Sequence, residues 1–134
     1  MDWLARALPT EGTEADLARV EEVLRDDVVT CGLEERVGDV MARVEGSPYG
    51  FALVESGSGV LLGRLRRSRC QEMYDALVAE VMEEGPSTVR ADTEAGKLAE
   101  RLAERDLKTA VVSTPDGRLL GVVRRSELEE RASG

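Results

Sequence analysis

The sequence predicts an α+β protein (α/β layered) made of two β-α-β-β-α units that pack about a pseudo-twofold axis, each preceded by a helix. Three observations predict this class. The chain repeats itself, strand-like and helix-like segments follow the same order in both copies, and 42% apolar content suits one ordinary core. Each copy is short enough to be marginal alone, so we expect the two copies to fold as one pair.

The repeat has no gap. Residues 16–73 overlay residues 74–131 at an offset of 58 with 17 identities, most densely where 59–68 meets 117–126. A repeat constrains the architecture before any single element does. Two similar units should leave a cleft into which equivalent loops point, and we expect any ligand chemistry there. The predicted organisation is a tail over 1–13, a diverged first repeat over 14–73 and a second repeat over 74–134.

The second copy has the clearer elements. Residues 87–90 are a short extended segment after Pro86, which cannot continue the preceding helix. A helix over 93–105 follows, with Asp92 as its cap and an apolar stripe at helical spacing. Strands over 109–113 and 118–123 are joined by the turn sequence Thr-Pro-Asp-Gly. These residues predict a hairpin behind a helix.

The remaining helices are predicted from caps and apolar spacing. Ser126 and Ser68 each begin a capping pattern, and the first-copy helix should run from 69 to about 84. Its counterpart before the first copy covers 15–24. In the tail, an amphipathic turn ended by Pro9 should pack on the fold or on a second subunit; its apolar residues are Trp3, Leu4, Ala7 and Leu8.

Composition excludes several functions. The net charge of −9 argues against general binding to nucleic acid or to anionic membranes, because both need a basic field. No apolar run is long enough to span a bilayer, so we expect a soluble cytoplasmic protein.

Cysteine and histidine usage excludes more. Cys31 and Cys70 align with Val89 and Leu128 and should be small buried hydrophobes, rather than a disulfide or a reactive thiol. Without histidine, an imidazole base or a common zinc site cannot be assembled. We therefore expect no catalytic residue and no metal site.

Three runs of the second copy carry a family resemblance. EVMEEGPSTV over 80–89, TAVV over 109–112 and DGRLLGVV over 116–123, with a helix between the first two, resemble a CBS domain, named after cystathionine beta-synthase. The first copy, from about 23 to 72, is a more diverged version. A tandem pair is called a Bateman module, and the resemblance covers nearly all of the chain after the first dozen residues.

The resemblance implies a regulatory or sensing module. Such pairs commonly bind adenosine-bearing ligands such as AMP, ADP, ATP or S-adenosylmethionine in the clefts between repeats, and they commonly dimerise into a flat disc. Their ligand signature is Gly, two apolar residues, Thr or Ser, two variable residues and Asp. The Asp accepts hydrogen bonds from ribose hydroxyls, and the hydroxyl residue helps to hold phosphate.

Both copies depart from that signature. In the second copy Arg124 replaces the hydroxyl residue, and Glu127 replaces the aspartate with a longer acceptor. In the first copy Arg66 and Arg69 stand at these places, so the ribose acceptor is lost. At most one site, in the second repeat, therefore looks competent for a nucleotide.

The candidate ligand-binding residues of the second repeat are Thr88, Val89, Ala110, Val111, Gly121, Arg124, Ser126 and Glu127. Those of the weaker first site are Thr30, Cys31, Ala52, Gly63, Arg66, Ser68 and Arg69. Structural alternatives stay open, since strand residues are usually core and the two glycines can mark a strand bend or a close backbone approach.

The arginines admit two interpretations. They could converge on phosphate as forked donors, or they could pair with the 27 acidic residues of the chain. The arginines concerned are Arg66, Arg67, Arg69, Arg124 and Arg125. The acidic pairs 21–22 and 83–84 are expected to be solvated helix faces rather than metal ligands.

Three function classes remain. The first is a sensor that binds an adenine nucleotide or S-adenosylmethionine as a regulatory ligand, needs no cofactor, and acts in trans on an unknown protein partner. The second is a degenerate pair that serves as a dimerisation or interaction scaffold. An enzyme is the third and least supported class, because no nucleophile with a base can be assembled. In the first two classes we expect a homodimer.

Overall fold

The structure is a computed structural model and describes residues 17–133. Its elements in chain order, with η for 3-10 helices, are η1 (Val20–Val23), β2 (Val29–Cys31), α2 (Val37–Glu45), β3 (Phe51–Glu55), β4 (Leu61–Arg66), η2 (Arg67–Arg69), α3 (Val78–Val81), β5 (Glu83–Glu84), β6 (Thr88–Val89), α4 (Ala95–Glu104), β7 (Thr109–Ser113), β8 (Leu119–Arg124) and α5 (Arg125–Ser133). The predicted mixture of helices and short strands is confirmed.

The described chain divides into two compact units. The sheet unit consists of residues 24–90 and 111–122, and the helical unit consists of 17–23, 91–110 and 123–133. Each unit draws on both copies of the repeat. The repeat boundaries that we predict at 13/14 and 73/74 stay a prediction.

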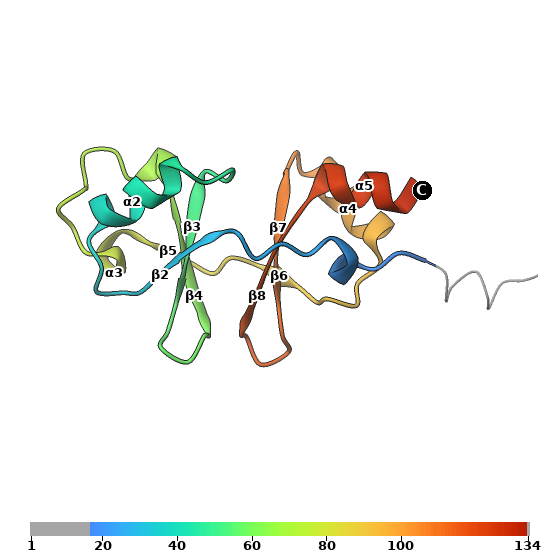
Figure 1. Cartoon of the computed structure of the whole chain (residues 1–134), viewed down its shortest axis with the longest axis horizontal. Helices are drawn as coiled ribbons and strands as arrows, with labels where there is room; N and C mark the ends of the chain where they lie inside the picture. The colour runs from blue at the N-terminus through green and yellow to red at the C-terminus, as the bar shows by residue number, and fades with distance from the viewer. Residues whose placement is uncertain (1–16, 134) are drawn as a thin grey trace, which may run out of the picture. The chain divides into compact units, whose positions relative to one another are not determined.

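The larger sheet has the order β2-β3-β4-β5 (Figure 1). β2 runs parallel to β3, whereas β3 and β4 form an antiparallel hairpin in which Phe51 lies opposite Arg66. β5 is antiparallel to β4, with Arg64 opposite Glu83. The three remaining strands form a second sheet in the order β6-β7-β8, with β6 parallel to β7.

β3 is buried on both of its faces. Alternate side chains of a strand point to opposite faces, and here Ala52 and Val54 enter one core cluster while Phe51 and Leu53 enter another. The first cluster is covered by the apolar stripe of α2, namely Val37, Val40, Met41 and Val44. Residues Val111 and Val122 of the second copy complete the other cluster. This double burial explains why β3 reads as a continuous apolar run.

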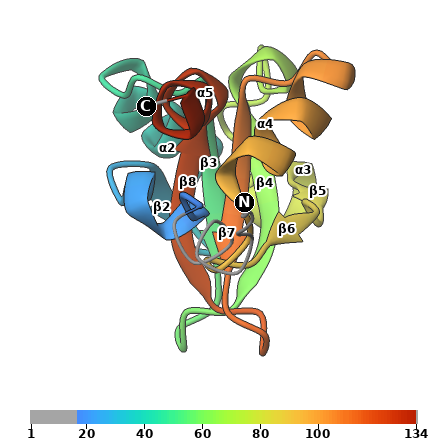
Figure 2. The ribbon, with the colours of Figure 1, turned by 90° about the vertical axis from the view of Figure 1, so that its right-hand side faces the viewer.

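The two hairpin turns of the sheet unit pair with each other. The Leu61 amide donates to the carbonyl oxygen of Gly117 at 2.9 Å, and the Leu119 amide donates to that of Gly59 at 3.1 Å. Because 59 and 61 align with 117 and 119 at the offset of the repeat, the two bonds are equivalent. Figure 2 shows the two hairpin tips crossing. The sheet unit therefore contains a local twofold relation between the copies.

The segment that leads into each copy hydrogen-bonds to the other copy. In the sheet unit, the Val78 amide donates to the Glu35 carbonyl at 2.9 Å. The equivalent bond in the helical unit joins the Val20 amide to the Thr93 carbonyl at 2.8 Å. Val20 and Val78 are both fully buried, which accounts for their identity across the repeat.

Several predicted elements are confirmed. The helix expected at 93–105 is α4, and the strands expected at 109–113 and 118–123 are β7 and β8. The short extended segment after Pro86 is β6. Cys31 and Cys70 are buried free thiols, as the alignment of the copies predicts.

Other predicted elements are wrong. The long helix expected at 69–84 is replaced by η2, a turn segment, the single turn α3, and β5. Contact with the other copy explains this, because backbone hydrogen bonds tie residues 74–79 to residues 33–38. Of the helix expected at 15–24, only η1 is helical among the described residues. The amphipathic turn expected at Trp3 to Pro9 lies outside the described residues.

The predicted helix caps are also wrong. The cap of α4 is Glu94 rather than Asp92, and Ser68 lies inside η2, whose cap is Arg66. Ser126 lies inside α5, which begins at Arg125. Amide donors at two helix starts are instead bound by Glu22 and Glu80, through bonds to Arg19 and Leu77 at 2.8 and 3.0 Å. These two glutamates are equivalent in the repeat and identical.

Within residues 17–133, no helix is long and apolar enough to cross a membrane.

Candidate functional site

All candidate residues of the first repeat lie in the sheet unit, but they do not form one open site. Cys31 and Ala52 point into the core beside α2, so their role is packing. Thr30 offers its carbonyl to the Arg43 guanidinium at 3.0 Å. Gly63 is required by a close approach: an added Cβ would lie 2.6 Å from the Glu83 carbonyl oxygen. Of the structural alternatives, core packing and close approach therefore apply here.

Two of the remaining first-repeat candidates, Arg66 and Arg69, contact one carboxylate, whereas Ser68 lies between them in η2. Arg66 binds Glu83 through two bonds, Nε to Oε1 at 2.8 Å and Nη2 to Oε2 at 2.6 Å. Arg69 Nε lies 3.4 Å from Oε2, and Arg64 Nε lies 3.9 Å from Oε1. The ion-pair interpretation holds for Arg66 and Arg69. We call these four residues the arginine cluster.

Contacts within the arginine cluster shift the pKa values of its members. The hydrogen bond from Arg66 lowers the pKa of Glu83, and the same bond raises the pKa of Arg66. Burial, together with Arg66, lowers the pKa of Arg64. Arg64 Nε is buried without a hydrogen-bond partner, and the guanidinium lies 6.0 Å from the centre of the Phe51 ring. Three cations therefore share one anion.

Four second-repeat candidates lie in the sheet unit. The Thr88 hydroxyl accepts a hydrogen bond from Ser113 Oγ at 2.9 Å, and Val89 follows it in β6. Val111 is buried in the core cluster around Phe51. Gly121 packs against the backbone of Arg25, whose carbonyl carbon would lie 3.1 Å from an added Cβ. Val111 and Gly121 thus have structural roles.

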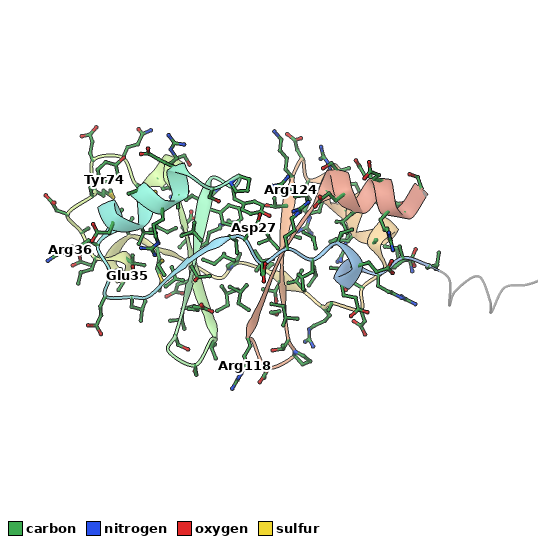
Figure 3. All side chains as sticks on the ribbon, in the orientation of Figure 1. Asp27, Glu35, Arg36, Tyr74, Arg118 and Arg124 are labelled. Carbon is green, nitrogen blue, oxygen red and sulfur yellow. The ribbon has the colours of Figure 1, made fainter. Side chains whose placement is uncertain are left out.

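The other four second-repeat candidates lie in the helical unit. Ala110 is in β7 and Arg124 ends β8, where Figure 3 labels it. Ser126 and Glu127 occupy the first turn of α5, where a carboxylate interacts favourably with the helix dipole. Arg125 beside them donates to the Leu107 carbonyl at 3.2 Å and lies 3.9 Å from Glu129. Arg125 is thus engaged by protein acceptors, as the ion-pair interpretation predicts.

The helical unit contains a hollow of about 620 Å³ that Glu127 lines. Its other walls come from η1 and α5 and the residues beside them, and we call it the η1–α5 groove. Arg131 Nη2 lies 2.8 Å from Glu22 Oε1, which joins the two helices on one side of the groove. The groove is lined by Leu17, Ala18, Val23, Glu127, Glu130 and Ala132, besides that ion pair.

Sequence reasoning misses two members of the arginine cluster. It predicts Glu83 on a solvated helix face, whereas the Glu83 side chain is three-quarters buried in β5 and binds arginines of β4 and η2. It does not single out Arg64 at all. The available signal is the alternation of Arg64 with Arg66 on one strand face, but their partner depends on β5 crossing to β4 from the other copy.

Metal ligands and reactive thiols can be assessed for residues 17–133. No group of three His, Cys, Asp or Glu side chains there could hold a metal ion. Burial raises the pKa of the Cys31 thiol to about 11 and that of Cys70 in the same direction. Both thiols are therefore poor nucleophiles near neutral pH.

Comparison with known sequences identifies the second repeat. Residues 78–134 match the sequence profile of the CBS domain family. The arabinose 5-phosphate isomerase KpsF of Escherichia coli is 28% identical over 115 residues, which cover 81% of this chain. The chain spans 35% of the length of that relative.

Comparison with solved structures concerns the whole fold. The CBS domains of a transcriptional regulator from Streptococcus pneumoniae superpose with a TM-score of 0.76 at 20% identity, over 86% of this chain and 99% of that one. The protein CBSX2 in complex with AMP superposes with a TM-score of 0.73 at 18% identity, over 86% and 96% of the two chains. The profile match identifies a CBS domain in residues 78–134, and the chain shares its fold with solved pairs of CBS domains.

Proposed function

We propose that this chain is a regulatory CBS pair that binds one adenine nucleotide through its second repeat and acts on a partner protein in trans. AMP, ADP and ATP are the ligands to test first, with S-adenosylmethionine next. The ligand biases a conformational equilibrium, and the partner senses the change.

The difference between Arg69 and Glu127 carries this proposal. They occupy equivalent positions, where the family signature has the carboxylate that accepts ribose hydroxyls. In the first repeat, Arg69 and Arg66 are both held by Glu83, so neither the acceptor nor two free forked donors remain. In the second repeat, Glu127 retains an acceptor in the first turn of α5. One site of the two therefore suits a nucleoside.

The comparison with CBSX2 supports the choice of ligand. That protein was crystallised with AMP, and its fold matches this chain over 86% of its length. In the helical unit, the candidate residues Arg124 and Ser126 add a guanidinium and a hydroxyl, groups that bind phosphate and ribose oxygens.

Thermal unfolding with added ligand tests the proposal. AMP, ADP, ATP, S-adenosylmethionine and NAD are each added at millimolar concentration, and the melting temperature is measured. A ligand at a hundred times its Kd stabilises the native state by roughly 2.7 kcal/mol, which raises the melting temperature by several degrees. We expect such a shift with at least one adenine nucleotide.

Matched variants locate the site. Glu127→Ala and Arg124→Ala should abolish the shift, whereas the first-repeat counterparts Arg69→Ala and Arg66→Ala should retain it. A shift lost only in the first-repeat variants would place the ligand in the first repeat and contradict the proposal. The absence of any shift across the panel would refute nucleotide binding.

The second candidate function is a scaffold that binds no nucleotide. It is favoured by the arginine cluster, since Glu83 occupies the guanidinium groups that a phosphate would need. It predicts no thermal shift with any ligand of the panel.

We also propose that the chain forms a homodimer, because its apolar content is modest and dimerisation is the habit of the family. Sedimentation equilibrium at tens of micromolar should give twice the chain mass of 14.6 kDa. A monomer mass under these conditions would exclude the dimer, whichever of the two functions is correct.

A further inference from the structure

We propose that the η1–α5 groove is the docking surface for the chain's own N-terminal segment, residues 3–8, whose apolar side chains cover it. The argument does not use the nucleotide proposal, but Glu127 lines this groove as well, so docking is tested in the ligand-free chain. It rests on the shape of the groove, on the difference between its two equivalent places in the repeat, and on where the described chain begins.

The groove is held open by its own contacts. Glu22 accepts the Arg19 amide at 2.8 Å and also binds Arg131 of α5. The same carboxylate therefore anchors the start of η1 and ties it to α5. Leu17, Ala18 and Val23 also line the groove and are only partly buried. A hollow of about 620 Å³ is within the size range of protein ligand pockets, so a large side chain fits.

The equivalent position in the other copy carries a larger side chain than the η1–α5 groove does. Ala132 lies over Gly96, its Cβ 3.5 Å from the Cβ that an alanine there would have. At the equivalent place in the sheet unit, Tyr74 lies over Gly38 at 3.1 Å. Residues 74 and 132, like 38 and 96, are equivalent positions of the repeat. The helical unit therefore has a methyl group where the sheet unit has a phenol ring.

The chain outside the described residues starts at this groove. Leu17, the first described residue, is one of its walls. Residues 9–16 separate Leu8 from Leu17, and an extended chain covers about 3.3 Å per residue, so the tether reaches any part of the groove. A short tether also gives a high effective concentration, which favours docking within the same chain.

The segment has the composition to cover an apolar wall. Four of its apolar residues, Trp3, Leu4, Ala7 and Leu8, have the spacing of one helix face. Arg6 is the only basic residue in 1–16, and Glu130 of the groove provides a carboxylate for it. Because the same stretch also carries several acidic side chains, apolar contact rather than net charge must hold it in place.

Trp3 makes the proposal directly testable, because it is the only tryptophan of the chain. Intrinsic fluorescence therefore reports on the segment alone. In the ligand-free full chain, we expect Trp3 emission to lie to the blue of N-acetyl-tryptophanamide in the same buffer, and acrylamide quenching to be weaker. The emission should not change with added salt.

A matched pair of variants identifies the surface. Ala132→Asp places a charge in the groove, and Tyr74→Asp places one at the equivalent, exposed position, which Figure 3 labels in the sheet unit. Both residues are on the surface, so both variants should fold, which circular dichroism checks. We expect Ala132→Asp to shift the emission to that of the free amide and Tyr74→Asp to leave it blue.

Three outcomes would overturn the proposal. Free-amide emission in the wild-type chain means that the segment does not dock. Equal responses of the two variants mean that the groove is not the surface. Blue emission that is lost on dilution means that a second copy, rather than the same chain, holds the segment.

Discussion

The carbonyl group of Arg25 lies against the α-carbon of Gly121, and its carbon would be 3.1 Å from any Cβ placed there. Arg25 and Val122 form a β-bridge, in which the Arg25 amide donates to Val122 at 2.8 Å. The same relation holds between Glu83 and Gly63, which occupy the equivalent positions of the repeat. The first glycine of the family's ligand signature is thus needed because the segment that leads into a copy, at Arg25 or Glu83, packs directly against it.

We therefore expect Gly121→Ala to destabilise the protein strongly. The added methyl group meets backbone atoms, which cannot move aside as a side chain can, and the φ of +154° already favours glycine. Overpacking of this kind costs about 3 kcal/mol. Urea denaturation of the variant measures the loss. Gly50→Ala is the control, because an added Cβ there would have no non-neighbouring atom within 4 Å. It should change the free energy of unfolding little.

The paired hairpin turns predict equal effects at equivalent positions. Gly59 and Gly117 have φ values of +88° and +90°, and each accepts a hydrogen bond from the other hairpin. Alanine at such a φ costs about 1 kcal/mol. Gly59→Ala and Gly117→Ala should thus lower the free energy of unfolding by the same amount, as measured in urea. A twofold or larger difference between them would contradict the local symmetry.

Glu83→Gln should destabilise the protein because it leaves three guanidinium groups of the arginine cluster without their anion. We expect a loss on the order of 1 kcal/mol at neutral pH, since the partners are partly exposed and screened. The lowered pKa of Glu83 sets the pH dependence. A carboxylate with a depressed native pKa stabilises the fold above its ordinary pKa.

That contribution is lost as the pH falls through the depressed native value. The free energy of unfolding of wild type should thus exceed that of Glu83→Gln at neutral pH and converge with it in acid. The neighbouring Glu84→Gln is the control, because Glu84 is exposed. A difference that stays constant from neutral to acidic pH would show that charge is not the cause.

The two thiols should be protected in the native state. Burial raises the pKa of Cys31 to about 11, so the native thiol keeps its proton at a pH where an unfolded thiol has lost it. Stability is therefore complete below the unfolded thiol pKa and falls as the pH rises above it. At pH about 8.5, the ordinary thiol pKa, a disulfide reagent should modify both cysteines far more slowly in native protein than in urea. Rapid modification of the native protein would place the thiols at the surface.

The repeat and the element order follow from local information. The offset of 58 aligns Gly59 with Gly117 and Val20 with Val78, and both pairs have matching roles in the structure. The apolar stripe of α4 and the turn before β8 could likewise be predicted, because periodicity and turn residues act within a few residues.

The interval from 69 to 84 could not be predicted in the same way. Its apolar spacing is that of a helix, yet most of the segment is not helical because its backbone bonds to residues 33–38, far away in the chain. Tertiary contacts override local propensity where they satisfy the same backbone groups. The caps failed for a different reason: Glu22 and Glu80 bind the amides of residues 19 and 77, three positions earlier in the chain, so the capping is local but lies at other positions than those predicted.

The repeat of 58 residues, the closer match of the second copy to the CBS pattern, and the difference between Arg69 and Glu127 at the signature carboxylate can all be read without coordinates. The partners that these residues meet depend on the fold. A turn segment and α3 separate Glu83 from Arg69 along the chain, yet Glu83 neutralises Arg66 and Arg69 because β5 pairs with β4. Alternation along a strand determines which face of the sheet a side chain lies on. The pairing of β4 with β5 determines which charged side chain lies next to it.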